Sequence, residues 1–274
     1  MPEPIKTALS LAAALLFLWS AVWCIRRVFS PEPAPHYTEP SSHSRCWAAI
    51  AGAAFILVLH LIFAVTAHIN YPEADLRQAI EWQFYGNTDS RHYLDLSIYG
   101  YGTQEAFPEQ YLQIVFFPLY PALLHILHFV TRIDAFWLGF AVQLPLFAAA
   151  TASFYTVIAR RWDEQTAALS LALLLASPAS VFFAVPMTES LFLLLTVRYV
   201  LTLEREQWWR CTLLGVLAGL CRAPGGLLLG LTGLYLFMRW RRGTRPTIPS
   251  LLAMLSPAAG LGLYFLLNYL VYGR

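Results

Sequence analysis

Apolar runs near membrane-spanning length recur along this whole sequence and restrict the folds open to it. A membrane-spanning helix needs about 20 mostly apolar residues, and about eight runs approach that length, the sixth being the shortest. We therefore predict an all-α, polytopic transmembrane protein with a large polar outer loop between the second and third runs. The predicted spans are residues 5–25, 46–69, 112–131, 135–159, 166–185, 189–203, 212–238 and 248–272.

The composition favours a membrane protein over a soluble one. Hydrophobic residues make up 58% of the 274 residues and charged residues only 12%, whereas a soluble domain carries about 25% charged residues. The formal net charge is only +2. Because the arginines gather at the ends of apolar runs rather than in one stripe, we expect membrane lipids and no nucleic acid as partners.

The first two runs are joined by a linker, residues 30–44, whose prolines and serines argue against packed structure. We predict that residues 1–45 form an N-terminal transmembrane helix with this linker, and that residues 46–274 form the main transmembrane domain. The N-terminal run is longer than a signal-peptide core of about 7–15 residues. We expect it to be retained.

The distribution of lysine and arginine predicts the orientation. Arginines flank the first linker and fill the loop at 239–245, so both should be cytoplasmic, whereas the acidic loop at 70–111 should lie outside. Simple alternation then places the loops near 160 and 204 outside as well. One re-entrant segment among the fifth to seventh runs would reverse the later loops.

The outer loop is expected to carry short interfacial helices. In residues 73–85, Leu76, Ile80 and Phe84 recur at a spacing of four, which is typical of an amphipathic helix lying on a membrane surface.

Asp89 is the strongest candidate for a catalytic group. If residues 89–97 begin as a helix, Asp89, His92 and Tyr93 share one face. The carboxylate can then act as a base toward an acceptor hydroxyl, while the imidazole and the phenol orient the substrate. The alternative is that Asp89 only caps an interfacial helix. The same region supplies further candidate substrate-binding side chains: Arg91, Tyr101 and Tyr120.

Two charged residues lie between or within later apolar runs. Glu189 is a candidate site residue because carboxylates at membrane depth are costly, although Thr188 and Glu189 can also serve as the start of a helix. Arg222 precedes Pro224-Gly225-Gly226, where the helix should break, and a guanidinium beside exposed amides suits a lipid phosphate. A snorkelling arginine at a span end is the alternative.

Four histidines, at positions 60, 68, 125 and 128, lie in the second and third runs. They are able in principle to ligate haem or a metal ion, but no cysteine or carboxylate keeps ligand spacing with them. We expect them to line a polar cavity, and we expect no metal and no cofactor.

Four blocks in order resemble the PIG-V-like mannosyltransferases, relatives of the enzyme that adds the second mannose to glycosylphosphatidylinositol (GPI) precursors. The blocks are residues 89–93 continuing to Gly100-Tyr101, residues 116–121 (FFPLYP), residues 177–180 leading to 188–190, and residues 219–222 with Gly225 behind. Thr88 stands where the family usually has tryptophan, and family members extend well past the position of Arg274, so a fragment is one expectation.

The resemblance implies a fold of the GT-C class and an inverting transfer outside the cytoplasm from a polyprenyl-phosphate sugar, usually mannose, to a lipid or glycan acceptor. On that basis Asp89 would be the general base, His92 and Tyr93 would line the sugar, and Arg222 would neutralise the leaving phosphate. No nucleotide and no obligatory metal would be required.

Two other functions stay open on the sequence. A transporter or lipid-handling protein is suggested by the broken helix and the charges at membrane depth, although no inverted repeat is evident. A non-catalytic scaffold on the same fold is suggested by Thr88. In each case we expect a multi-pass protein of the cell membrane, in the bacterial inner membrane or, in a eukaryote, the endoplasmic reticulum.

Overall fold

The computed structural model describes residues 38–102 and 110–273, together with residues 11, 15, 18 and 19. Contacts within the chain divide it into Met1–Tyr37 and Thr38–Arg274. The predicted first span at 5–25 lies almost wholly outside the described residues. The second unit begins before the predicted boundary at 45, because the end of the proposed linker is structured: the Thr38 amide donates to the carbonyl of Arg160, 3.4 Å away.

Every regular element in the described residues is a helix, and they contain no strand. Three helical stretches are long and apolar enough to cross a membrane. They are α2 (Ser42–Asn70), the stretch Ala135–Arg161 formed by α6 (Ala135–Ala141) and α7 (Gln143–Arg161), and α12 (Ile248–Tyr272). All three coincide with predicted runs, which confirms the all-helical class and the presence of membrane-length helices.

The other predicted runs form shorter or interrupted helices. The run at 212–238 breaks where predicted, because the proline lacks an N–H and the next helix starts afresh. The run at 166–185 ends early, where Pro178 begins a 3₁₀ turn. The elements are η1 (Gln110–Val115), α5 (Leu119–Thr131), α8 (Glu164–Ala176), η2 (Pro178–Phe183), α9 (Glu189–Glu204), α10 (Trp208–Cys221), η3 (Ala223–Gly226) and α11 (Leu227–Arg241).

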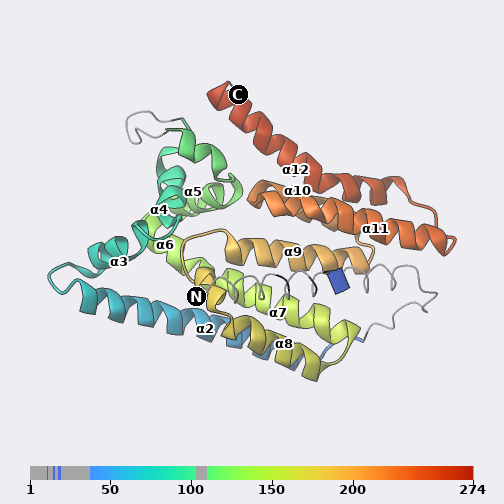
Figure 1. Ribbon diagram of the computed structural model, residues 1–274, viewed down its shortest axis with the longest axis horizontal. Helices are drawn as coiled ribbons and strands as arrows, with labels where there is room; N and C mark the ends of the chain where they lie inside the picture. The colour runs from blue at the N-terminus through green and yellow to red at the C-terminus, as the bar shows by residue number, and fades with distance from the viewer. Residues whose placement is uncertain (1–10, 12–14, 16–17, 20–37, 103–109, 274) are drawn as a thin grey trace. The chain divides into compact units, whose positions relative to one another are not determined.

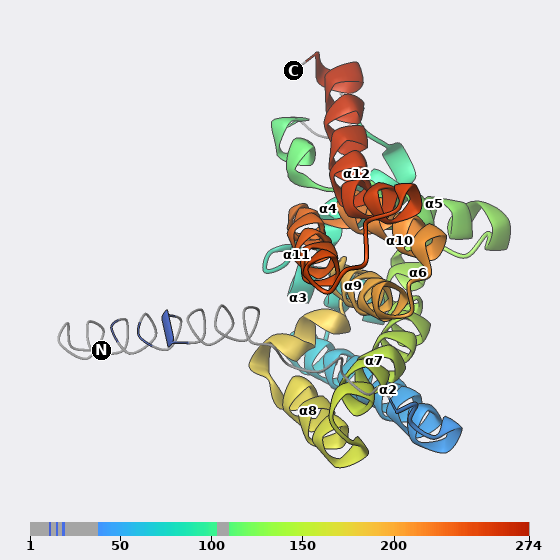
Figure 2. The ribbon, with the colours of Figure 1, turned by 90° about the vertical axis from the view of Figure 1, so that its right-hand side faces the viewer.

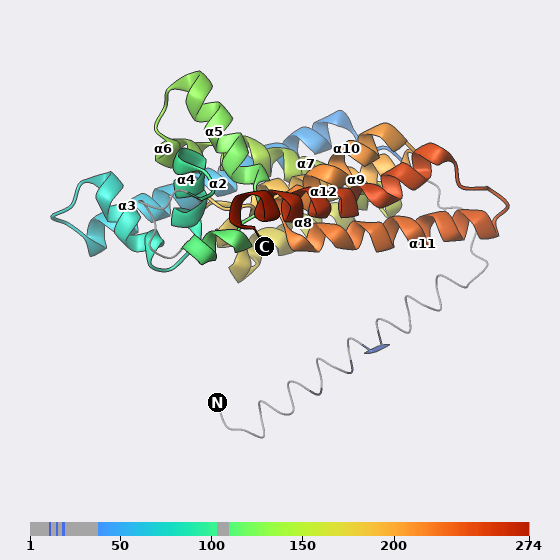
Figure 3. The same cartoon turned by 90° about the horizontal axis from the view of Figure 1, so that it is seen from above.

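Within Thr38–Arg274, the long helices lie side by side, and α3 (Leu76–Tyr85), α4 (Ser90–Tyr99), α5 and α6 gather at one end (Figure 1). Seen end-on, α7 lies between α2 and α9 (Figure 2). The view from above shows α11 running along one edge, with α12 beside it (Figure 3). α12 bends partway along its length (Figure 1), and Pro257, which lies inside this helix, gives a physical cause because it removes one backbone hydrogen bond.

The loops near 160 and 204 share one end of the helices with the loop near 240, which corrects the predicted orientation. Arg161 donates to Glu204 across 2.6 Å, and Arg239 lies 2.9 Å from Glu206. The loops near 160 and 204 therefore cannot face the side opposite the arginine-rich loop before α12.

The difference begins with the third predicted span. Its helix, α5, has 13 residues, about 20 Å at 1.5 Å per residue, which is shorter than the roughly 30 Å hydrocarbon core. Instead of crossing, α5 contacts α4 and α6 at the end of the long helices where these short helices gather. Without that crossing, the loops near 160 and 204 fall on the side of the first linker. Because the chain turns back at the break between α10 and α11, Arg239 returns to Glu206 and the loop near 240 lies at the same end. The expected alternation is therefore not what the structure shows, and eight spans are not shown.

The predicted interfacial helix forms as α3, which Asp75 caps by accepting from the Gln78 amide at 2.9 Å. Ile80 and Phe84 are buried as expected, but Leu76 is exposed.

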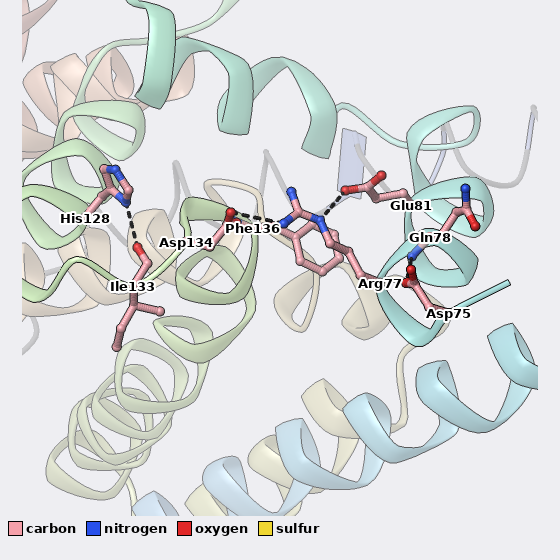
Figure 4. A network of polar contacts seen from close by, with 8 residues as sticks. All are labelled: Asp75, Arg77, Gln78, Glu81, His128, Ile133, Asp134 and Phe136. Atoms are coloured by element: carbon pink, nitrogen blue, oxygen red, sulfur yellow. Dashed lines mark hydrogen bonds and ion pairs between the residues drawn. The ribbon is translucent and has the colours of Figure 1, made fainter.

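Arg77 fastens α3 to the start of α6, as Figure 4 shows. Its guanidinium donates to Glu81 at 2.9 Å and to Asp134 at 3.0 Å, and it lies over the Phe136 ring. Asp134 also caps α6 by accepting from the Phe136 amide at 2.8 Å. These contacts hold α3 against the start of α6, next to α4.

Candidate functional site

Asp89 lies at the N-terminal cap position of α4, but its side chain accepts no capping hydrogen bond and is exposed. Thr88 organises the turn instead. Its hydroxyl donates to the Phe84 carbonyl at 3.0 Å and accepts from the Ser90 amide at 3.3 Å. The interpretation of Asp89 as only a helix cap is therefore not supported, and the carboxylate is available to a ligand.

Asp89 opens onto a cavity of about 400 Å³ that three separate parts of the chain enclose. α4 supplies the acidic and polar side, the segment between η1 and α5 supplies an aromatic side, and the break between α10 and η3 supplies a basic side. The lining residues are Asp89, His92, Tyr93, Val115, Phe116, Phe117, Arg222, Ala223 and Pro224.

The helix over 90–99 brings His92 and Tyr93 to the same face as expected, and both pack on Phe116. The His92 ring stacks on the Phe116 ring with centroids 4.8 Å apart, and Tyr93 meets it edge-on at 5.0 Å. Burial raises the pKa of Tyr93 to about 12. Its phenol is protonated at neutral pH, as an ordinary tyrosine is, and Tyr93 lines the cavity.

The aromatic side of the cavity is held in place from outside. Tyr101 donates a hydrogen bond to the Phe116 carbonyl at 2.6 Å. Tyr264 of α12 stacks on Phe117 with ring centroids 3.9 Å apart and donates to the Ile114 carbonyl. Tyr101, predicted as substrate-binding, is thus not among the lining residues and instead positions the wall.

The basic side of the cavity depends on the broken helix. α10 ends at Cys221, Arg222 takes an extended backbone conformation, and Ala223-Pro224 begin the next turn. Arg222 donates through Nη1 to the Glu189 carboxylate at the start of α9. Glu189 does not line the cavity. Its contribution to the site is to position the Arg222 guanidinium, which does line it.

Two other predicted site residues lie away from the cavity. Arg91 is exposed and pairs with Asp95 at 3.4 Å on the next turn of α4. Tyr120 is fully buried, donates to the Gly139 carbonyl at 3.1 Å and accepts from Gln143 at 2.8 Å. Tyr120 was expected to touch substrate because it belongs to the aromatic–proline run, but that run turns it inward beneath Tyr93.

Of the four histidines in the second and third runs, three each bond a backbone carbonyl, and His68 is exposed. His60 lies 2.8 Å from the Ala184 carbonyl, His125 lies 2.8 Å from that of Ser97, and His128 lies 2.6 Å from that of Ile133 (Figure 4). Among the described residues, no three histidine, cysteine, aspartate or glutamate side chains are grouped as a metal ion would need.

The aromatic wall is the part of the cavity that the sequence did not assign as site residues. Phe116 and Phe117 follow the polar loop directly, and that position was the available signal. Pro224 belongs to the helix break that was predicted beside Arg222, whereas Val115 was not expected to line the cavity.

Comparisons with protein-family models, with curated proteins and with solved structures gave no match for this chain. The geometry of the cavity places an exposed carboxylate, a phenol, aromatic faces and a guanidinium around one space.

Proposed function

We propose that this chain is a membrane glycosyltransferase that moves a sugar, mannose on the PIG-V-like resemblance, from a polyprenyl-phosphate donor to a lipid or glycan acceptor. The observation that carries the proposal is that Asp89 and Arg222, far apart in the sequence, line one cavity. A base for an acceptor hydroxyl and a cation for a leaving phosphate are the two charged groups that this transfer needs.

The residues divide the reaction between them. The acceptor oxygen attacks the anomeric carbon as its proton passes to the Asp89 carboxylate, and the bond from that carbon to the phosphate oxygen breaks. The electron pair leaves with the polyprenyl phosphate, whose added charge Arg222 stabilises. His92 and Tyr93 orient the sugar, and the faces of Phe116 and Phe117 are suited to its apolar surface.

Three of the four blocks on which the family resemblance rests contribute to this cavity. Asp89, His92 and Tyr93 come from the first block, Phe116 and Phe117 from the second, and Arg222 from the fourth. Glu189 of the third block binds Arg222. That convergence supports the proposal, because blocks that only stabilised helices would have no reason to meet at one hollow.

The test uses membranes containing the wild-type chain, Asp89→Asn or Glu73→Gln at matched expression, supplied with labelled polyprenyl-phosphate mannose. Glu73 is an exposed carboxylate of the same loop outside the cavity and serves as the control. We expect transfer of label into a lipid or polymer fraction by wild type and Glu73→Gln, and a loss of roughly 10²–10⁴-fold in Asp89→Asn. Equal transfer by Asp89→Asn would remove Asp89 as the base.

A further inference from the structure

A second cavity, of about 310 Å³, lies at the other end of the long helices. It is enclosed by the start of α2, the later part of α7 and the later part of α9, whereas α9 begins beside the Arg222 cavity. Its polar lining includes Arg45, Arg198, Arg205, Ser153 and Thr156. We call it the arginine cavity.

The positive charge of the arginine cavity is only partly balanced. Arg205 donates to both carboxylate oxygens of Glu39 at 2.9 Å, so it is occupied. Arg45 and Arg198 are exposed, and among the described residues neither lies within ion-pairing distance of a carboxylate. Two guanidinium groups therefore face this space without a counter-charge from the described chain.

The hydroxyl groups that α7 contributes to the cavity already donate to backbone carbonyls. Ser153 donates to the Ala149 carbonyl at 2.7 Å and Thr156 donates to the Ala152 carbonyl at 2.7 Å. Their donors are used within α7, so the charged groups offered to an anion here are the arginines.

The position of Arg198 is not explained by the preference of arginine for the ends of membrane helices. It precedes Glu204, the last residue of α9, by six positions, about 9 Å along a helix. Its neighbours in α9 are mostly apolar. A charged group set this far into an apolar helix is costly in a membrane unless it is used. Arg205 directly follows α9, seven residues after Arg198, which is close to two helical turns, and both arginines line the same space.

We propose that the arginine cavity binds the phosphate of an anionic phospholipid headgroup in the leaflet at this end of the helices. A guanidinium presents a planar fork of donors that matches phosphate oxygens, and basic pockets between helices are suited to such headgroups. α2 and α7 belong to stretches of membrane-spanning length, so a cavity at their end lies at headgroup depth. A water-soluble phosphate shares the chemistry, and the test separates the two sources.

The test measures binding of phosphatidylglycerol, phosphatidylcholine and inorganic phosphate to the purified full chain in neutral detergent, by native mass spectrometry and by the shift in thermal midpoint. The variants are Arg198→Gln and Arg45→Gln, with Arg245→Gln as the control. Arg245 is an exposed arginine at the same end of the helices but outside the cavity.

We expect the wild-type chain to bind phosphatidylglycerol in preference to phosphatidylcholine. Arg198→Gln should bind phosphatidylglycerol at least about tenfold more weakly than wild type, and Arg245→Gln should bind it as wild type does. Arg45→Gln, at the exposed start of α2, gives the same readout if Arg198→Gln does not fold. Displacement of the lipid by millimolar inorganic phosphate would assign the site to soluble phosphate. Equal binding of both lipids, or equal losses in Arg198→Gln and Arg245→Gln, would overturn the proposal. The result does not depend on transferase activity.

Discussion

The guanidinium of Arg222 donates a hydrogen bond to the carboxylate of Glu189, which joins the break after α10 to the first turn of α9. The pair is partly buried, with 19% of the Glu189 side chain and 37% of the Arg222 side chain exposed. Arg222 also lines the cavity of Asp89. The ion pair therefore makes the orientation of the Arg222 guanidinium depend on how α9 and α10 are placed.

The Glu189–Arg222 pair should show measurable coupling. In a double-mutant cycle of Glu189→Gln and Arg222→Gln, we expect a coupling energy of about 1–3 kcal/mol in the free energy of unfolding, because each single change leaves a partly buried partner unpaired. Denaturant unfolding in detergent measures it. The control is the pair Glu206–Arg239, whose carboxylate is 44% exposed against 19% for Glu189, and for which about 0.2–1 kcal/mol is expected. Coupling near zero at Glu189–Arg222 would contradict the positioning role.

Glycine at 260 should be required for the contact between α10 and α12. A Cβ atom at Gly260 would lie 2.2 Å from the Val216 carbonyl oxygen, whereas one at Gly262 would meet nothing within 4 Å. We expect Gly260→Ala to lower the free energy of unfolding by roughly 1–3 kcal/mol through overpacking. Gly262→Ala, on the same helix, should be neutral or stabilise by up to about 1 kcal/mol. Similar thermal midpoints for the two variants would contradict this close approach.

Asp95 should make stability depend on pH. Burial raises the pKa of its carboxyl despite the pairing with Arg91, so the folded state holds this proton more tightly than the unfolded state. The stability contributed by the protonated form is present below the unfolded pKa, near 4, and is lost as pH rises through the folded value. Asp95→Asn should therefore be more stable than wild type at pH 7, with a difference that shrinks as the pH falls toward 4.

Thermal midpoints across pH 4–8 test this expectation, with Glu73→Gln as an exposed control that should follow the wild-type curve. A constant difference between Asp95→Asn and wild type at all pH values would show that titration of Asp95 is not the cause.

Tyr264 should hold the aromatic wall of the cavity through its hydroxyl as well as its ring. Tyr264→Phe keeps the stacking on Phe117 but leaves the Ile114 carbonyl without this donor, at a cost of about 1–3 kcal/mol. We expect faster amide hydrogen exchange over residues 110–117 and slower transfer. Tyr269→Phe, on the same helix with 62% of the residue exposed, is the control and should change neither. Unchanged exchange in Tyr264→Phe would mean that the wall is held by other contacts.

Local signals in the sequence predicted individual elements well. The last helix was expected at 248–272 and forms at Ile248–Tyr272, because an apolar run is a local feature. The break after Cys221 was expected for the same reason, since proline and glycine act on their own backbone. The grouping of Asp89, His92 and Tyr93 followed from helical spacing alone.

Long-range arrangement was beyond the reach of those signals. The hydropathy of residues 112–131 is the same whether the segment crosses a bilayer or packs on α4, so the sequence could not show that α5 stops short. In the same way, composition marks Tyr120 as a candidate site residue, but the side chain is drawn inward by its bonds to Gly139 and Gln143.

The sequence by itself determined the helical class, the membrane-length runs, the helix break and the face that Asp89 shares with His92. Each of these follows from residues close together in the chain, through hydropathy, backbone chemistry and helical period. Only the tertiary structure decided which side the loops near 160 and 204 occupy, that Glu189 binds Arg222, and that Arg222 faces Asp89 across one cavity. Those relationships depend on how whole helices pack, and packing is a sum over contacts between residues that the chain order does not bring together.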